Sequence, residues 1–271
     1  MHSKFDTLAA DAYDGMMGRW SRRLAPQFLD FAGVRDGERV IDIGCGTGSL
    51  TFAVLERANI GRIDAVDLNA GFLEALRHHN TDSRVVTQHG DACALPFADA
   101  VFDRAFSLLV LQHLSEGERA VGEMYRVLRP GGAAAAAVWD TFGGMPTQRV
   151  FWDTIAALEP SAGDRRAAAH GKPNTEQGQI KNAFLDAGFQ DVVETTLAIR
   201  MDFKNFEDYW HPQIFGQGDT AQWLSALPGA VQDRLQSAVR AAYLCNRPDG
   251  PRSFATVAWA VKGQRPRVAS G

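Results

Sequence analysis

The apolar and polar residues in the first half of the chain follow two alternating patterns. Short, mostly apolar runs predict buried strands, and between them apolar residues recur every three or four positions, which predicts amphipathic helices. The predicted strands cover residues 40–43, 62–66, 84–87, 101–106 and 133–139. Because strands alternate with helices, the pattern predicts an α/β fold with a parallel sheet covered by helices on both faces.

Two predicted helices have recognisable boundaries. The first is expected over residues 21–32, ahead of the first strand, on apolar positions at helical spacing: Trp20, Leu24, Phe28 and Phe31. The second is expected over residues 115–128, where Ser115 and Glu118 have the spacing of a capping box. A Pro-Gly-Gly sequence then ends this helix before the fifth strand begins.

The second half of the chain is less regular. Helical spacing recurs over residues 150–158, 180–185 and 228–244, and alternation predicts strands over 193–199 and 254–261. The polar residues 159–179 are predicted to form a mobile loop. The two late strands are separated by a long insertion, so we expect them to extend the sheet edge in antiparallel fashion.

A glycine-spaced turn follows the first predicted strand. Gly44, Gly46 and Gly48 stand at alternate positions, and a helical pattern begins at Leu50. Glycine at such positions allows positive φ angles and close approach of a ligand to the backbone, and the next helix points its free N–H groups at the turn. The spacing differs from the G-x-G-x-x-G of dinucleotide folds. Taken alone, the motif is also compatible with a purely structural turn.

Polar residues stand where the predicted strands end. Ligands of parallel α/β sheets bind at the carboxyl ends of the strands, so these residues should lie along one rim. Asp67 has the spacing of a carboxylate that accepts two ribose hydroxyls, although it could instead cap the next helix. Asp91 could accept the amine of an adenine beside the Ala92 N–H, or be a solvated loop residue. Asp42, inside a strand, needs buried partners, either a ligand ammonium or turn N–H groups.

Composition narrows the class of protein. The chain has 271 residues, is 45% hydrophobic and carries a net charge of −4, which disfavours nucleic acid as the main partner. Three cysteines at 45, 93 and 245 lack C-x-x-C spacing, so we expect free thiols in a cytoplasmic protein. We find neither an apolar signal region nor a run long enough to span a membrane. No residues have metal-ligand spacing.

Five ordered motifs resemble those of the class I S-adenosylmethionine-dependent methyltransferases, and most closely the small-molecule branch of the ubiquinone/menaquinone-type methylases. The motifs are residues 40–48, Asp67, Gly90-Asp91-Ala92, the stretch from Phe102-Asp103 to Leu109–Leu114, and Val127–Gly132. The resemblance covers residues 36–140, with a weaker match up to the last strand. It implies a Rossmann-like seven-stranded sheet whose last strand is antiparallel.

The resemblance also implies an organisation and a ligand. Residues 1–35 would be an N-terminal helical lid, and residues 36–271 the methyltransferase domain. Insertions within about 141–180 and 203–250 would cover the substrate. The cofactor would be S-adenosyl-L-methionine, leaving S-adenosyl-L-homocysteine as product. The implied cofactor-binding residues are Arg19, Trp20, Asp42, Gly44, Cys45, Gly46, Gly48, Asp67, Leu68, Asp91, Ala92, Ser107, Leu108 and Gln112.

Each group of these residues has an implied role. The Gly44–Gly48 backbone would cradle the methionine portion, and Asp67 and Leu68 would hold the ribose and adenine. Asp91 and Ala92 would read the adenine edge. A further set, Ser107, Leu108 and Gln112, would line the side that carries the sulfonium. Arg19 and Trp20 would close over the site.

Methyl transfer needs alignment and exclusion of water, and it needs a base only if the acceptor must lose a proton. His113, just after the fourth strand, is the nearest candidate base, with a packed structural histidine as the alternative. Asp140, His170 and His211 are further candidates with structural alternatives. The Asp/Asn-Pro-Pro-aromatic signature of nucleic-acid amino-methylases is absent after the fourth strand.

We therefore expect methyl transfer to a small, apolar or aromatic metabolite by a monomer or homodimer. The aromatic residues of the 141–253 region would supply the pocket walls, or instead belong to the core. Two alternatives stay open: a catalytically silent module that binds the cofactor, and a nicotinamide-dependent oxidoreductase. Three features argue against the oxidoreductase: the glycine spacing, Asp91 and the Leu128–Gly132 motif.

Overall fold

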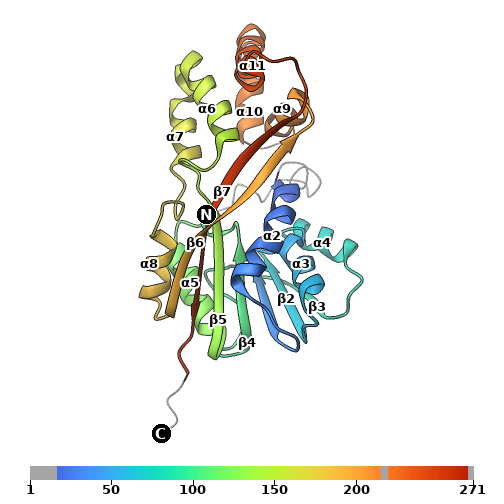
Figure 1. Cartoon of the computed structure of the whole chain (residues 1–271), viewed down its shortest axis with the longest axis vertical. Helices are drawn as coiled ribbons and strands as arrows, with labels where there is room; N and C mark the ends of the chain where they lie inside the picture. The colour runs from blue at the N-terminus through green and yellow to red at the C-terminus, as the bar shows by residue number, and fades with distance from the viewer. Residues whose placement is uncertain (1–16, 215–218, 268–271) are drawn as a thin grey trace.

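The computed structural model describes residues 17–214 and 219–267, and its centre is one seven-stranded sheet in the order β3-β2-β1-β4-β5-β7-β6 (Figure 1). The strands from β3 to β5 are parallel, and β7 is antiparallel to both of its neighbours, β5 and β6. The strands are β1 Arg39–Ile43, β2 Arg62–Asp67, β3 Val85–His89, β4 Phe102–Leu108, β5 Leu128–Trp139, β6 Gln190–Phe203 and β7 Arg252–Gln264. The predicted fold class and the antiparallel last strand are confirmed.

Helices cover both faces of the sheet. On one face, α2, α3 and α4 share a core with Val40 and Ile63, while α5 and α8 share the other core with Ile41 and Ile43. Alternate residues of a strand point to opposite faces, so β1 contributes to both cores. These helices are α2 Arg19–Ala32, α3 Ser49–Arg57, α4 Ala70–His79, α5 Gly117–Val127 and α8 Gln179–Asp186.

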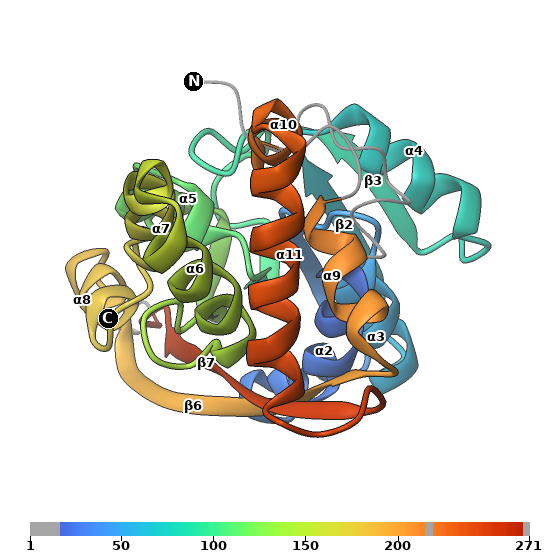
Figure 2. The same ribbon diagram turned by 90° about the horizontal axis from the view of Figure 1, so that it is seen from above.

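A second group of helices forms a cap beyond the carboxyl ends of the parallel strands (Figures 1 and 2). Three of them lie in the chain between β6 and β7, and two lie between β5 and α8. Aromatic rings bind the cap together, and Tyr209 stacks on Tyr243 with ring centroids 5.0 Å apart. The cap helices are α6 Pro146–Leu158, α7 Gly163–His170, α9 Phe206–Ile214, α10 Asp219–Ala226 and α11 Gly229–Leu244.

Three local predictions are wrong. Residues 159–179 are not simply a loop, because they contain the 3-10 turn η3 (Pro160–Ala162) and α7. The α7 sequence is rich in Arg and Ala, which favour helix without an apolar stripe, so periodicity missed it. The capping box is also absent: α5 begins at Gly117 with Glu116 at its N-cap and no side-chain cap bond, which leaves Ser115 outside the cap position. Finally, β5 begins directly at Leu128.

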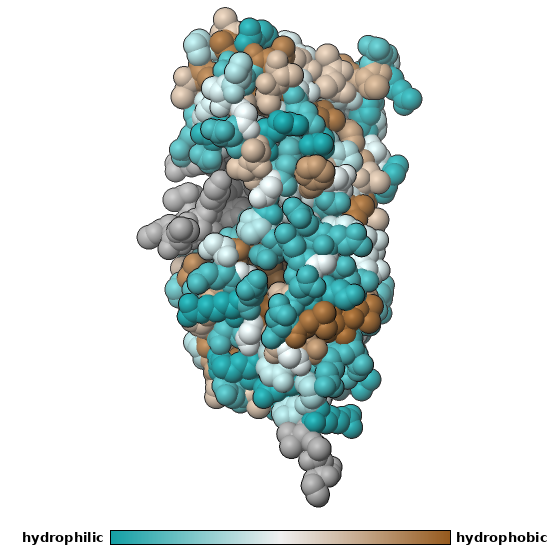
Figure 3. Space-filling view, turned by 90° about the vertical axis from the view of Figure 1, so that its left-hand side faces the viewer, coloured by the Kyte–Doolittle hydropathy of each residue, from teal (hydrophilic) through white to brown (hydrophobic). Residues whose placement is uncertain are grey.

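One face of the molecule combines a hydrophilic surface with a compact apolar area in its lower half (Figure 3). This face carries α8, whose Leu185 is 49% exposed, and the start of β6, whose Val193 is 46% exposed. In the part of the chain that the structure describes, no helix combines the length and the apolarity that crossing a membrane requires.

The contact between α2 and β4 yields a stability prediction. Phe28 of α2 is fully buried and meets Phe106 of β4 edge-to-face, with ring centroids 5.7 Å apart. Phe28→Ala should lower the free energy of unfolding in urea by about 3–5 kcal/mol, because it leaves a cavity in the core. The matched surface variant Leu185→Ala should change it by less than about 0.5 kcal/mol. Equal losses in the two variants would contradict this packing.

Candidate functional site

The glycine turn lies between the ends of β1 and β2. The N–H groups of Gly44 and Cys45 both donate to the Val66 carbonyl, at 2.7 and 2.9 Å, and this fixes the turn to β2. Gly44, Gly46 and Gly48 have φ angles of 73°, 54° and 98°. A Cβ at Gly44 would overlap the methyl groups of Val110. Glycine is therefore required at position 44 by both its backbone conformation and its surroundings.

Asp67 is bonded to the same turn. One carboxylate oxygen accepts the Gly46 N–H at 2.8 Å, and the other accepts the Asn69 N–H at 2.8 Å. Burial raises the pKa of Asp67. Asn69 caps α4, since its side chain accepts the N–H groups of Gly71 and Phe72, so the interpretation of Asp67 as the helix cap is wrong. The next residue, Leu68, is 43% exposed, which leaves an apolar side chain at the rim.

Asp42 lies below the turn and is only 1% exposed. The Thr51 hydroxyl of α3 donates to its carboxylate at 2.6 Å. Burial raises the pKa of Asp42 to about 7, the Thr51 bond opposes this rise, and the negative charge of Asp67 adds to it. Burial likewise raises the pKa of the Cys45 thiol, so this cysteine is a packed thiol within the motif.

The ends of β3 and β4 complete the rim. The Gly90 N–H donates to the Asp67 carbonyl at 3.1 Å, so β3 ends beside Asp67. Asp91 is exposed, and its carboxylate accepts the Cys93 N–H at 2.8 Å, leaving other lone pairs open. On the other side, the Ser107 hydroxyl donates to the Ile43 carbonyl at 3.3 Å, which joins the end of β4 to β1.

Gln112 and His113 belong to the 3-10 turn η2 (Leu111–His113) after β4. The buried side chain of Gln112 accepts the Trp139 N–H at 2.8 Å through its oxygen. This bond fixes the orientation of the amide, so its nitrogen is the atom that lies 3.3 Å from His113 Nε2. An amide nitrogen can only donate, and His113 Nε2 therefore accepts in this arrangement.

A cavity of about 590 Å³ lies between η2 and the cap. Its apolar wall consists of aromatic and thioether side chains: Met17, Trp20, Trp139, Met145, Trp152, Met201, Phe203 and Tyr209. Both arginines that line it are paired, Arg19 with Asp208 and Arg165 with Asp219, each at 2.8 Å. The Arg19 guanidinium also lies over the Trp20 ring, 4.2 Å from its centroid.

The predicted site residues thus fall into two neighbouring groups. One group lies in the last residues of β1, β2 and β4 or directly after β1, β2 and β3: the glycine turn, Asp42, Asp67, Leu68, Asp91, Ala92, Ser107 and the buried Leu108. Arg19, Trp20, Gln112 and His113 line the cavity under the cap.

Three other candidates do not line this cavity. Asp140 accepts the Gly143 N–H at 2.9 Å and so caps a turn. His170 is buried, with Nδ1 at 3.2 Å from the Thr141 carbonyl oxygen, and burial lowers its pKa. His211 lies on α9, beside the cavity-lining Pro212 and Gln213.

Sequence reasoning missed Thr51 and the cavity residues of α7. Thr51 could have been found because it stands in the helix after β1, where its hydroxyl can donate to the carboxylate of Asp42 within that strand. For Arg165, the prediction of a loop over 159–179 hid the helix that places it.

This rim of glycine turn and carboxylates on a seven-stranded sheet defines the class of protein. The sequence model of a family described as "Methyltransferase domain" matches residues 41–136. Together with the relatives below, this shows that the chain belongs to the class I S-adenosylmethionine-dependent methyltransferases. It is an enzyme, and S-adenosylmethionine is its cofactor. The oxidoreductase and binding-only alternatives receive no support.

Within this family the chain is similar to ubiquinone/menaquinone biosynthesis C-methyltransferases. It is 31% identical to the Klebsiella pneumoniae protein over 206 residues, covering 69% of this chain and 82% of that one. It is 27% identical to the Roseobacter denitrificans protein, covering 70% and 79% of the two chains.

Solved structures share the fold at lower identity. A Haloferax volcanii methyltransferase, solved with its Trm112 activator, matches with a TM-score of 0.63 and 19% identity, covering 98% of this chain and 100% of that chain. A phosphoethanolamine N-methyltransferase of Haemonchus contortus, solved with S-adenosylhomocysteine, matches with a TM-score of 0.59 and 18% identity. This second match covers 96% of this chain and 57% of that one.

The crowding at Gly44 can be separated from its backbone strain. Gly44→Ala should unfold at lower urea and lose affinity for S-adenosylhomocysteine, because the new methyl group would overlap Val110. Gly37→Ala is the matched control, since Gly37 has a similar φ of +77° but nothing within 4 Å of a Cβ. Calorimetric titration and urea unfolding measure both effects. If both variants lost the same free energy of unfolding, the positive φ angle alone would account for the glycine at position 44.

Asp42 should make stability depend on pH. Between the ordinary pKa of 3.8 and the folded value of about 7, the folded state holds its proton while the unfolded state has lost it. Stability therefore falls as pH rises through this range. Asp42→Asn keeps an acceptor for Thr51 and removes the cost of ionising a buried carboxylate. The free energy of unfolding of this variant, relative to the wild type, should therefore rise by about 2 kcal/mol between pH 5.5 and 8.5. Urea unfolding at both pH values measures this. An advantage that is independent of pH would contradict the raised pKa.

Proposed function

We propose that the enzyme methylates a small, uncharged, apolar or aromatic metabolite that binds in the cavity under the cap. The observation that carries this proposal is the cavity wall, where Trp139, Trp152 and Phe203 stand among thioether side chains. Flat apolar rings fit such walls. Because the relatives are named as C-methyltransferases of ubiquinone and menaquinone biosynthesis, we favour a quinol-like ring as the substrate and transfer of the methyl group to a carbon atom.

Charge pairing supports an uncharged acceptor. Arg19 and Arg165 line the cavity, but each is paired with an aspartate at 2.8 Å, and the lining residues Lys172 and Asp164 add one charge of each sign. A phosphate or carboxylate on the acceptor would have to displace one of these partners. The phosphorylated amine bound to the Haemonchus contortus enzyme is therefore a poor guide to this substrate.

The rim residues fit the cofactor. The Gly44–Gly48 turn presents bare backbone, since a Cβ at Gly44 would overlap Val110 and a Cβ at Gly48 would overlap Phe52. In our proposal this turn and Asp42 hold the methionine portion, with Ser107, Leu108 and Gln112 on its sulfonium side. Asp67 accepts the ribose hydroxyls, Leu68 covers the adenine, and Asp91 with Ala92 reads the adenine edge.

When bound, the cofactor supplies an electrophilic methyl group, so the chain mainly has to align the acceptor and keep water out. The apolar cavity wall excludes water. His113 lines the cavity, and its Nε2 accepts a hydrogen bond from Gln112. Once that bond is released, Nε2 can take a proton from a hydroxyl group of the substrate that is methylated. Arg19 and Trp20 belong to the cavity wall in this proposal.

The domain organisation remains part of the proposal. The pair between Arg19 of α2 and Asp208 of α9 ties the start of α2 to the cap, which supports a lid role for the N-terminal segment. Its residues 1–16 lie outside the described part. Cap helices of both insertions, within 141–180 and 203–250, line the cavity. Three free cysteines, two of them buried, favour the cytoplasm.

Two variants should separate the acceptor cavity from the cofactor rim. With isotopically labelled S-adenosylmethionine and a panel of quinols, phenols, amines and phosphorylated amines, methyl transfer should occur to the uncharged rings. Trp152→Ala should then raise KM for the acceptor, while Asp67→Ala should raise KM for the cofactor, each by about tenfold or more. Transfer only to phosphorylated amines would refute the proposed acceptor class.

A further inference from the structure

A second cavity, of about 260 Å³, lies at the opposite edge of the sheet from the cofactor rim. It is bounded by the end of α2 and the segment that follows, by the first half of β4 and the middle of β5, by the start of β6, and by the end of β7. The lining includes three small residues, Gly33, Ala133 and Gly263. It is therefore separate from both halves of the proposed active site.

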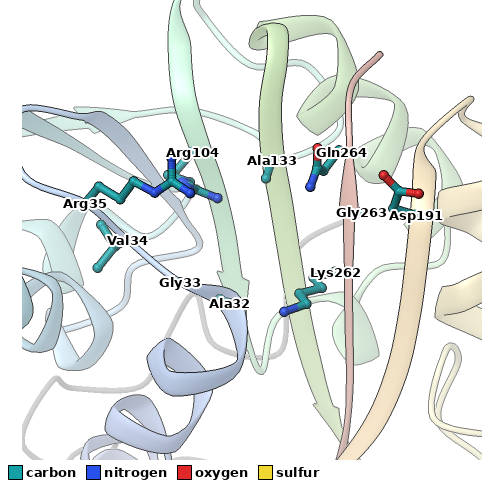
Figure 4. Close-up of a pocket in the computed structure, with 10 residues that line it drawn as sticks. All are labelled: Ala32, Gly33, Val34, Arg35, Arg104, Ala133, Asp191, Lys262, Gly263 and Gln264. Carbon is teal, nitrogen blue, oxygen red and sulfur yellow. The ribbon is translucent and has the colours of Figure 1, made fainter. Parts of the chain in front are cut away.

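Three cationic side chains reach this cavity. Figure 4 shows Arg35, from the segment after α2, and Arg104 of β4 on one side of the cavity, and Lys262 of β7 on the other. Asp191 is the only acidic residue of its described lining, and it lies beyond β7 in the same view. Glu38 pairs with Arg104 and adds a second carboxylate beside the cavity, so three cations stand against two carboxylates and the net charge is positive.

The hydrogen-bonding capacity of these cations is incompletely used within the described residues. Arg104 donates through Nε to both oxygens of Glu38, at 3.0 and 2.9 Å, which leaves its two terminal nitrogens available. Lys262 donates to the Phe31 carbonyl at 2.8 Å and lies over the Phe31 ring, 4.7 Å from its centroid, so its contacts are with neutral groups. By contrast, Arg129 at the same sheet edge is paired with Asp103.

We propose that this cavity binds a small oxyanion of the phosphate type. A guanidinium offers parallel N–H groups that match two oxygens of a phosphate, and an ammonium adds a further donor. The volume is below the roughly 300–1,000 Å³ of pockets for larger ligands, which limits the ligand to a phosphate group with a short substituent at most. Inorganic phosphate and a small phosphate monoester share this chemistry.

Calorimetric titration with inorganic phosphate and with glycerol 3-phosphate, in a buffer without other oxyanions, tests the proposal. We expect one saturable site per chain in the wild type. Arg35→Gln and Lys262→Gln should each weaken phosphate binding by about tenfold or more. Arg267→Gln is the matched control, because it removes the same charge from an exposed residue at this edge that does not line the cavity. Retained binding of S-adenosylhomocysteine shows that each variant is folded.

The outcomes separate the possibilities. Tighter binding of the monoester identifies a phosphorylated metabolite as the ligand, and tighter binding of inorganic phosphate identifies the free ion. Saturating S-adenosylhomocysteine should leave phosphate binding intact, because the two sites lie at opposite edges. The proposal is overturned if no site saturates, if Arg267→Gln weakens binding as much as the cavity variants, or if S-adenosylhomocysteine abolishes the phosphate signal.

Discussion

The site depends on two hydrogen bonds from the turn after β1 to the carbonyl that ends the buried part of β2. Through the N–H groups of Gly44 and Cys45 they hold the glycine turn against Val66. The next residue, Asp67, then reaches back to the Gly46 N–H. Turn and carboxylate therefore position each other, and both follow from the parallel register in which Ile43 pairs with Val66. A shift of this register would separate them.

A buried carboxylate beneath this turn works against stability. The Asp42 carboxylate accepts the Thr51 hydroxyl and shares its surroundings with the negative charge of Asp67. A fully apolar residue at this strand position would pack without that penalty. Residues that are poorly suited to the empty protein often mark places where a ligand supplies the missing interaction, which supports our proposal that Asp42 holds the methionine portion of the cofactor.

The sequence predicted the structure well where local residue patterns alone determine which elements come together. Strand–helix alternation and strand-end residues such as Asp67 predicted the sheet and its rim, because parallel strands bring their carboxyl ends to one edge. It was less informative for the cap. The Arg- and Ala-rich α7 has no apolar stripe, and the pairs Arg19–Asp208 and Arg165–Asp219 join residues far apart in the chain. Such contacts exist only once the tertiary fold is formed.

The hairpin of β6 and β7 has a consequence for how this enzyme can change. Phe203 and Arg252 are register partners, so the insertion that carries α9, α10 and α11 leaves and re-enters the sheet at neighbouring points. Its ends are held together whatever lies between them. Substitutions or length changes inside the insertion can reshape the cavity wall without moving β1 or β2. Under the proposed function, acceptor preference can therefore diverge in evolution while the cofactor rim is inherited intact.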